Sequence, residues 1–169
     1  MSRIYVANLA AYNAGRLVGE WLDLEDYADA EELSAAVEAL TGEDEFAIHD
    51  YEGFGGFSIG EYSPLDFVFR LHELVESHGA AFAVFAENIW TNRIDTADDL
   101  DDAESAFIDA WIGNISAEDY AYDYVTDCLG LEGIALDYFD FAKFARDLII
   151  GGDISEHYED GEIYLFHNN

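Results

Sequence analysis

Apolar residues in the first third of the chain follow the spacing of short strands and of one helix. From residue 30 to residue 40 they recur every third or fourth position, which is typical of a helix with one buried face. Asp29 is placed to cap this helix and Gly42 to end it. Three runs rich in β-branched and aromatic residues predict strands, at 3–7, 16–24 and 45–51. We therefore expect an N-terminal α/β domain over residues 1–62.

Helical spacing dominates the middle of the chain. Pro64 stands where a first helical residue is expected, and apolar residues then recur at helical spacing until Gly79. The largely apolar run 80–90 predicts a buried helix, and a Thr-x-x-Asp pair opens an acidic helix over 97–106. These features indicate a central helical domain.

The last third of the chain alternates between strand and helix patterns and ends in a hairpin. Asp160-Gly161, between two alternating runs, is the dipeptide of a two-residue hairpin turn. The expected elements are a strand at 107–113, helices at 116–128 and 136–149, and strands at 154–158 and 162–166, with 107–113 as a possible third strand of the sheet. We therefore predict an α+β fold of three small domains: 1–62, 63–105, and a C-terminal domain of sheet and helices, 106–169.

The charge of the chain is one-signed. The 169 residues carry 38 Asp and Glu against 6 Lys and Arg, a net charge of -32, yet 51% of residues are hydrophobic, which is enough to build a core. Duplex DNA carries one charge per roughly 1.7 Å, so this net charge matches about 54 Å of duplex, whereas a compact sphere of this chain length is about 40 Å across. Such a protein repels nucleic acid and anionic membranes, and basic grooves attract it.

Motifs for catalysis or metal binding are incomplete. The glycine-rich loop 52–61 matches no phosphate-binding template and has Glu at both ends, while the segment from His72 to Glu76 lacks the second His of a zinc motif. Cys128 is the single cysteine, and no nucleophile, base and orienting group recur at a recognisable spacing. We expect neither an enzyme nor a cofactor or metal site. With no signal peptide or membrane-spanning run, we expect a cytoplasmic protein.

The longest stretch without a basic residue lies between Arg93 and Lys143 and is rich in Asp and Glu. An ordinary solvated helix mixes both signs, because like charges one turn apart repel. Adaptation to a salt-rich cell is one explanation for this composition, and it makes no statement about function. A second is an acidic module that binds a basic protein, such as a histone-like or ribosomal partner.

Three N-terminal segments and one C-terminal region carry the motifs of a known family. The segments are Ile4-Tyr5-Val6-Ala7-Asn8-Leu9 with Tyr12-Asn13 and Gly15, Leu17-Val18-Gly19-Glu20-Trp21, and Phe46-Ala47-Ile48-His49-Asp50-Tyr51-Glu52. The C-terminal region contains Tyr138, Phe141 and Ala145-Arg146-Asp147-Leu148. In this order and spacing the three segments resemble the N-terminal part of the ArdA family of antirestriction proteins, and the C-terminal residues resemble its C-terminal part. The resemblance implies an elongated chain of three domains that forms a homodimer through the last one. It also implies a DNA mimic that occupies the DNA-binding groove of type I restriction-modification enzymes.

On this resemblance, carboxylates stand in for phosphates and a hydrophobic patch joins two copies of the chain. The carboxylates expected to form the DNA-mimic surface are Glu20, Asp23, Glu31, Glu32, Glu38, Asp95, Asp98, Asp99, Asp101, Asp102, Glu104, Asp109, Glu118, Asp119, Asp123 and Asp127. The residues expected at the dimer interface are Tyr120, Tyr124, Val125, Leu129 and Leu131, which could instead form the core of the last domain. The expected partners are thus the restriction-modification enzyme and a second copy, with no nucleic acid and no membrane.

Overall fold

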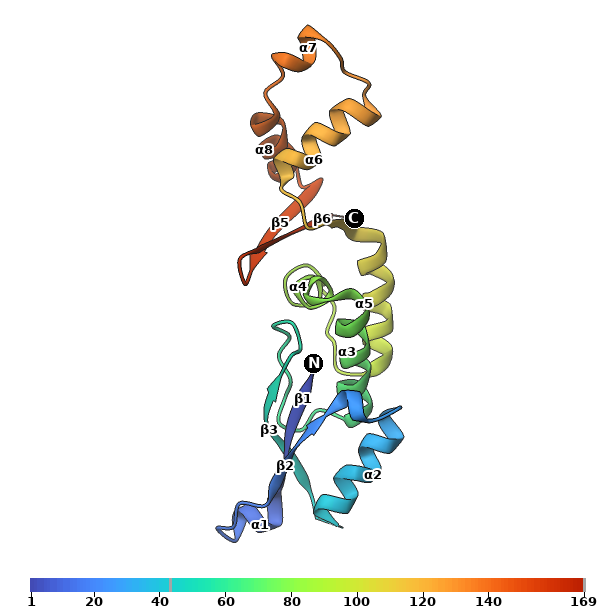
Figure 1. Ribbon diagram of the computed structural model, residues 1–169, viewed down its shortest axis with the longest axis vertical. Coiled ribbons are helices and arrows are strands. Elements are labelled where there is room, and N and C mark those ends of the chain that lie inside the picture. The colour runs from blue at the N-terminus through green and yellow to red at the C-terminus, as the bar shows by residue number, and fades with distance from the viewer. Residues whose placement is uncertain (43, 169) are drawn as a thin grey trace. The chain divides into compact units, whose positions relative to one another are not determined.

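The structure is a computed structural model that describes residues 1–42 and 44–168 (Figure 1). The chain divides between Ser105 and Ala106 into two compact units, here called unit 1 and unit 2. Each unit has one small three-stranded antiparallel sheet and several helices. The predicted α+β class is therefore confirmed, while the division into three domains stays a prediction.

The sheet of unit 1 has its first strand in the centre. Strand β1 (Arg3–Asn8) pairs with β2 (Gly19–Asp23) on one side and with β3 (Phe46–Glu52) on the other. All three predicted strands are confirmed, although β2 begins at Gly19 rather than at residue 16; residues 16–18 are exposed, and of them Val18 O accepts the Asn8 N–H of β1 at 2.9 Å. Alternate residues of β1 face the interior, and Ile4 and Val6 are fully buried.

The helices of unit 1 begin and end largely where the sequence predicts. The Asp29 side chain accepts the backbone N–H groups of Glu31 and Glu32, both at 2.9 Å, which confirms it as the cap of α2. Pro64 precedes its helix as the capping residue rather than standing inside the first turn. The elements are α1 (Leu9–Asn13), the 3-10 turn η1 (Leu24–Asp26), α2 (Ala30–Thr41), α3 (Leu65–His78) and α4 (Ala80–Asn88).

Helix α5 (Ala97–Ala110) is longer than predicted, and the expected strand 107–113 is wrong over most of its length. Only Trp111–Gly113 forms a strand, β4. The side chains of Leu100, Ala103, Phe107 and Ala110 share one face of the helix, and all are nearly or fully buried. This buried stripe outweighs the strand propensity of the aromatic and β-branched residues at 107 and 108.

The sheet of unit 2 has its last strand in the centre. Strand β6 (Glu162–His167) pairs with the hairpin partner β5 (Ile154–Glu159) and with β4, in the order β4-β6-β5. The hairpin turn is Asp160-Gly161, and both residues have positive φ, as a two-residue turn of this kind requires. The predicted hairpin is confirmed, and so is its third strand within β4.

The helical part of unit 2 differs from the prediction in one place. Residues 136–149 do not form one helix, because Asp140 leaves helical geometry and its side chain caps a new helix by accepting the Lys143 N–H at 2.9 Å. The left-handed Gly152 ends that helix. The elements are α6 (Ala117–Asp123), the π-helical turn η2 (Tyr124–Cys128), α7 (Ile134–Asp137) and α8 (Phe141–Gly151).

Unit 2 has a small core of its own. Ala117, Ala121, Ala145, Ile154 and Leu165 are buried together, with half-buried aromatic and aliphatic side chains around them. Alanines on the facing sides of α6 and α8 let the two helices approach closely. Among the described residues, no helix is both long enough and apolar enough to cross a membrane.

Candidate functional site

Helix α5 separates its residues into an apolar side and an acidic side. Leu100 and Ala103 are fully buried in unit 1, while Asp98 and Asp102 are exposed on the opposite side, one turn apart. Among the described residues, no Lys, Arg or His lies within ion-pair distance of these two carboxylates. We call Asp98 and Asp102 the outward pair.

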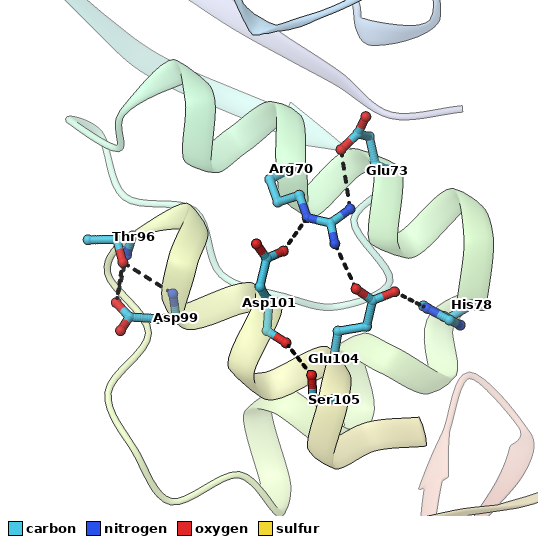
Figure 2. Close-up of polar contacts among 8 residues, drawn as sticks. All are labelled: Arg70, Glu73, His78, Thr96, Asp99, Asp101, Glu104 and Ser105. Carbon is cyan, nitrogen blue, oxygen red and sulfur yellow. Dashed lines mark hydrogen bonds and ion pairs between the residues drawn. The ribbon is translucent and has the colours of Figure 1, made fainter. Parts of the chain in front are cut away.

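One arginine from α3 holds two of the other carboxylates of α5, Asp101 and Glu104 (Figure 2). Arg70 Nε donates to Asp101 Oδ1 at 2.7 Å, and Nη2 donates to Glu104 Oε2 at 2.7 Å. Its Nη1 also lies 3.3 Å from Glu73 on its own helix. Partial burial opposes the charge of Arg70, but the hydrogen bonds and charges of Asp101 and Glu104 keep its pKa above the ordinary value. Arg70 with Asp101 and Glu104 is called the α3–α5 clamp below.

A histidine adds to the α3–α5 clamp at its second carboxylate. His78 Nε2 lies 2.7 Å from Glu104 Oε1, so Glu104 contacts both Arg70 and His78 of α3 (Figure 2). The Glu104 side chain is only 24% exposed. The two oxygens of this carboxylate are therefore occupied by the protein itself, in contrast with the outward pair.

Asp99 is also occupied, by the start of its own helix. Its Oδ2 accepts the Thr96 hydroxyl at 2.7 Å and the backbone N–H groups of Thr96 and Asp95 (Figure 2). The Thr96 hydroxyl in turn accepts the Asp99 N–H, which makes the predicted capping pair reciprocal. These hydrogen bonds, that of the hydroxyl first, lower the pKa of Asp99. Arg93 forms an ion pair with Asp95, so that carboxylate is partly compensated as well.

More carboxylates of the segment between Arg93 and Lys143 therefore have a nearby positive charge or hydrogen-bond donor than the sequence predicts. Its counter-charges come from outside the interval, and Arg70 is 31 residues from Asp101. No sequence pattern connects residues that far apart without a known fold, so the clamp could not be predicted. Among the described residues, only the outward pair of the α5 carboxylates in unit 1 accepts no hydrogen bond, while Arg70 offsets one of the charges of Asp101 and Glu104.

The remaining predicted carboxylates lie on both units. In unit 1, Glu20, Glu31 and Glu38 are exposed. Glu32 accepts the Ala28 N–H at 2.8 Å. Asp23 is half-buried, and one of its oxygens is buried without a hydrogen-bond partner among the described residues. In unit 2, the predicted carboxylates are exposed, namely Asp109, Glu118, Asp119, Asp123 and Asp127. Asp119 accepts the Ser116 hydroxyl at the start of α6.

The predicted dimer residues have different environments within unit 2. Tyr120 and Leu131 are half-buried, and Tyr120 stacks on Tyr124 with ring centroids 6.1 Å apart. Val125 is 0% exposed, so its side chain belongs to the interior of unit 2. Leu129 is 61% exposed, the most exposed side chain of the set, and it could contact a second molecule without a rearrangement. The interface itself stays a prediction.

The described residues offer no metal centre, since no group of three or more His, Cys, Asp or Glu side chains among them could hold an ion. The fold and the exposed carboxylates together define the class: a strongly acidic α+β protein that presents carboxylates along helices.

The sequence model of the family described as antirestriction protein (ArdA) matches residues 4–161, and the chain belongs to this family. The predicted family is thus confirmed. ArdA is an antirestriction family rather than a catalytic one, which points to restriction-modification enzymes as partners. No curated protein matches the chain.

Proposed function

We propose that the protein blocks type I restriction-modification enzymes by occupying the groove that holds their DNA. Membership of an antirestriction family supports an action against restriction enzymes. The mechanism is competition: carboxylates engage the Lys and Arg side chains that otherwise contact phosphates. Both restriction and modification need the bound duplex, so both are inhibited.

The spacing of charge along α5 carries this proposal. From Ala97 to Glu104 the helix rises about 12 Å and has five carboxylates. The guanidinium of Arg70 compensates one of these charges. The remainder is about one charge per 3 Å of helix axis, close to the 3.4 Å per phosphate of one DNA strand. A basic groove shaped for a phosphate backbone therefore meets a similar density of negative charge.

A homodimer through unit 2 is part of the proposal. Several large apolar side chains of unit 2 are exposed, among them Leu129, Ile134, Tyr138 and Ile150. Exposed apolar side chains on such a charged protein favour a contact with another protein surface. A second copy of the chain would bury these residues and would double the acidic surface offered to the enzyme.

Competition with DNA tests the proposed function. A labelled duplex is bound to the methyltransferase core of a type I enzyme at physiological salt, and the protein is added at near-stoichiometric amounts. Displacement far stronger than that by polyglutamate of equal total charge is expected, because spacing as well as charge is copied. Displacement no stronger than polyglutamate would contradict the mechanism and would favour the alternative of an acidic module for another basic protein.

A further inference from the structure

The glycine-rich loop of unit 1 borders a pocket of about 620 Å³. The loop residues line it together with the start of α3, the end of α4 and the segment before α5. Its apolar floor includes Phe57 and Phe67, which are buried, and half-buried Ile94. The volume lies within the range of pockets that bind small ligands.

The polar groups of this pocket are acidic. Glu61, Glu87 and Asp95 line it, whereas no Lys, Arg or His is among the described lining residues. Arg93 compensates Asp95, and the nearest basic atom to Glu61 is His49 Nε2, at 3.9 Å. Glu61 and Glu87 therefore supply most of the uncompensated charge.

Glu87 is held in place by the loop itself. Its Oε1 accepts the Ser58 N–H at 2.8 Å, and no described residue donates a hydrogen bond to Oε2. One oxygen is thus fixed by the backbone while the other is free to accept a donor from a ligand. A carboxylate with one anchored oxygen binds a cation with little loss of side-chain entropy.

An aromatic side chain stands at the same pocket. Tyr62 is 67% exposed although it is large and aromatic, and it lines the pocket beside Glu61. The Glu61 carboxylate raises the pKa of Tyr62, because its negative charge disfavours the phenolate. An aromatic ring face attracts cations through its quadrupole, and the effect adds to that of the carboxylates.

We propose that this pocket binds a cation on an aliphatic stem, an ammonium or guanidinium group whose head contacts Glu61 and Glu87 and whose stem covers Phe57 and Phe67. A phosphate is excluded by the carboxylates, and an apolar floor suits a methylene chain better than a hydrated metal ion. Such a cation is either a free polyamine or a Lys or Arg side chain of a partner protein. A side chain of the target enzyme as the ligand rests on the proposed function, whereas a free polyamine does not, and binding of the cation can be tested with the protein alone.

Titration with spermidine and with N-acetylarginine amide, followed by NMR at physiological salt, tests the proposal. Saturable shifts are expected for the amides of Ser58, Gly60 and Asn92, and the Ser58 N–H reports directly on Glu87. The Glu61→Gln/Glu87→Gln variant should bind at least about tenfold more weakly, since both charged hydrogen bonds are lost. Tyr62→Ala removes only an exposed ring that is proposed to attract the cation. It should also weaken binding, and it serves as the second test variant if the double variant folds poorly.

The matched control is Glu25→Gln/Asp26→Asn, which removes the same charge from exposed positions of η1 in the same unit. This control should keep the affinity of the wild type. If the control loses as much affinity as the pocket variant, or if the shifts spread evenly over the acidic surface, the cation is only a diffuse counter-ion and the proposal is overturned.

The DNA-displacement assay then separates the two sources of the cation. If the pocket variant no longer binds spermidine but displaces DNA as well as the wild type does, the ligand of the pocket is a free polyamine. If the variant loses both spermidine binding and DNA displacement, the ligand is a side chain of the enzyme. Failure of the wild type to displace DNA would contradict the proposed function and would leave the NMR result unaffected.

Discussion

At the scale of single residues, the cations of this chain are few and each has a distinct environment. Arg3 forms an ion pair with Glu52 and lies over the Trp21 ring, 4.7 Å from its centroid. Arg70 contacts three carboxylates at once, and its side chain is only 28% exposed. A partly buried arginine with several hydrogen bonds contributes more than an exposed pair does.

Arg70→Gln is expected to destabilise unit 1 by about 2 kcal/mol, because charged hydrogen bonds are lost and three carboxylates are left to repel one another. For a unit of this size the melting temperature should fall by roughly 10 °C. Arg16→Gln is the matched control, since Arg16 is exposed and pairs with no described carboxylate. Equal effects of the two substitutions in thermal denaturation would contradict the clamp.

His72 gives unit 1 a dependence on pH that a phenylalanine would remove. The side chain is buried, and its Nδ1 has no described hydrogen-bond partner. Burial lowers the pKa of His72, although the negative charges of Glu76, Glu25 and Glu73 act to raise it. The α-amino group of Met1 also disfavours its charge. A folded pKa below the unfolded value of 6.5 means that the stabilisation is complete above that pH and is lost as the pH falls below it.

The melting temperature of His72→Phe minus that of the wild type should therefore be more positive at about pH 5.5 than at about pH 7.5. The difference between the two proteins is the informative quantity, because the many carboxylates titrate in both. A difference that is the same at both pH values would show that His72 takes up no proton on unfolding.

At the scale of elements, the sequence predicts where most helices and strands lie but fails where two patterns compete. The segment 107–112 has the composition of a strand, with Phe107, Ile108, Trp111 and Ile112. The buried stripe that continues from Leu100 nevertheless favours a helix, which extends to Ala110. Local capping at Asp140 likewise divides a helix that the apolar spacing predicts as continuous. The clamp on α5 could not be predicted at all, because it joins residues from separate helices.

The two kinds of carboxylate on α5 should behave differently when they are neutralised. Asp98→Asn/Asp102→Asn removes the outward pair, so inhibition of the restriction enzyme should weaken roughly tenfold while the melting temperature changes little. Asp101→Asn/Glu104→Gln removes the same charge from the clamp, so the melting temperature should fall more. Thermal denaturation and the displacement assay check the two expectations. The assignment of the outward pair to binding and of the clamp to stability would be contradicted if the clamp variant lost more inhibition, or if the outward-pair variant had the lower melting temperature.

The exposure of Leu129 makes it the better test of the proposed dimer than buried Val125. Leu129→Asp should leave unit 2 folded and should convert the dimer to a monomer, because a carboxylate in an apolar contact loses its hydration. Mass and folding are measured by light scattering and circular dichroism. Leu17→Asp, at an apolar position of unit 1 that is 79% exposed, is the control and should not change the mass. A dimeric Leu129→Asp protein would place the contact elsewhere.

At the scale of the whole molecule, like charges repel in the folded state more than in the unfolded one. The 38 Asp and Glu side chains have only 6 Lys and Arg side chains to pair with, so a net charge of -32 remains after every ion pair is counted. Added salt screens this repulsion, since the Debye length falls from about 14 Å at 0.05 M to about 3 Å at 1 M. The melting temperature should therefore rise by several degrees over this range, whereas displacement of DNA from the enzyme should weaken. A melting temperature that ignores salt would contradict a largely uncompensated surface.

The α3–α5 clamp also affects how the sequence can change over generations. An exposed aspartate is one of many similar charges, so its loss can be offset by a new carboxylate nearby, and the acidic positions are free to drift. Arg70 joins Asp101 and Glu104 at the same time, and among the described residues no other arginine or lysine contacts either of them. Negative charge in this protein is interchangeable, whereas the positive charge at position 70 is not.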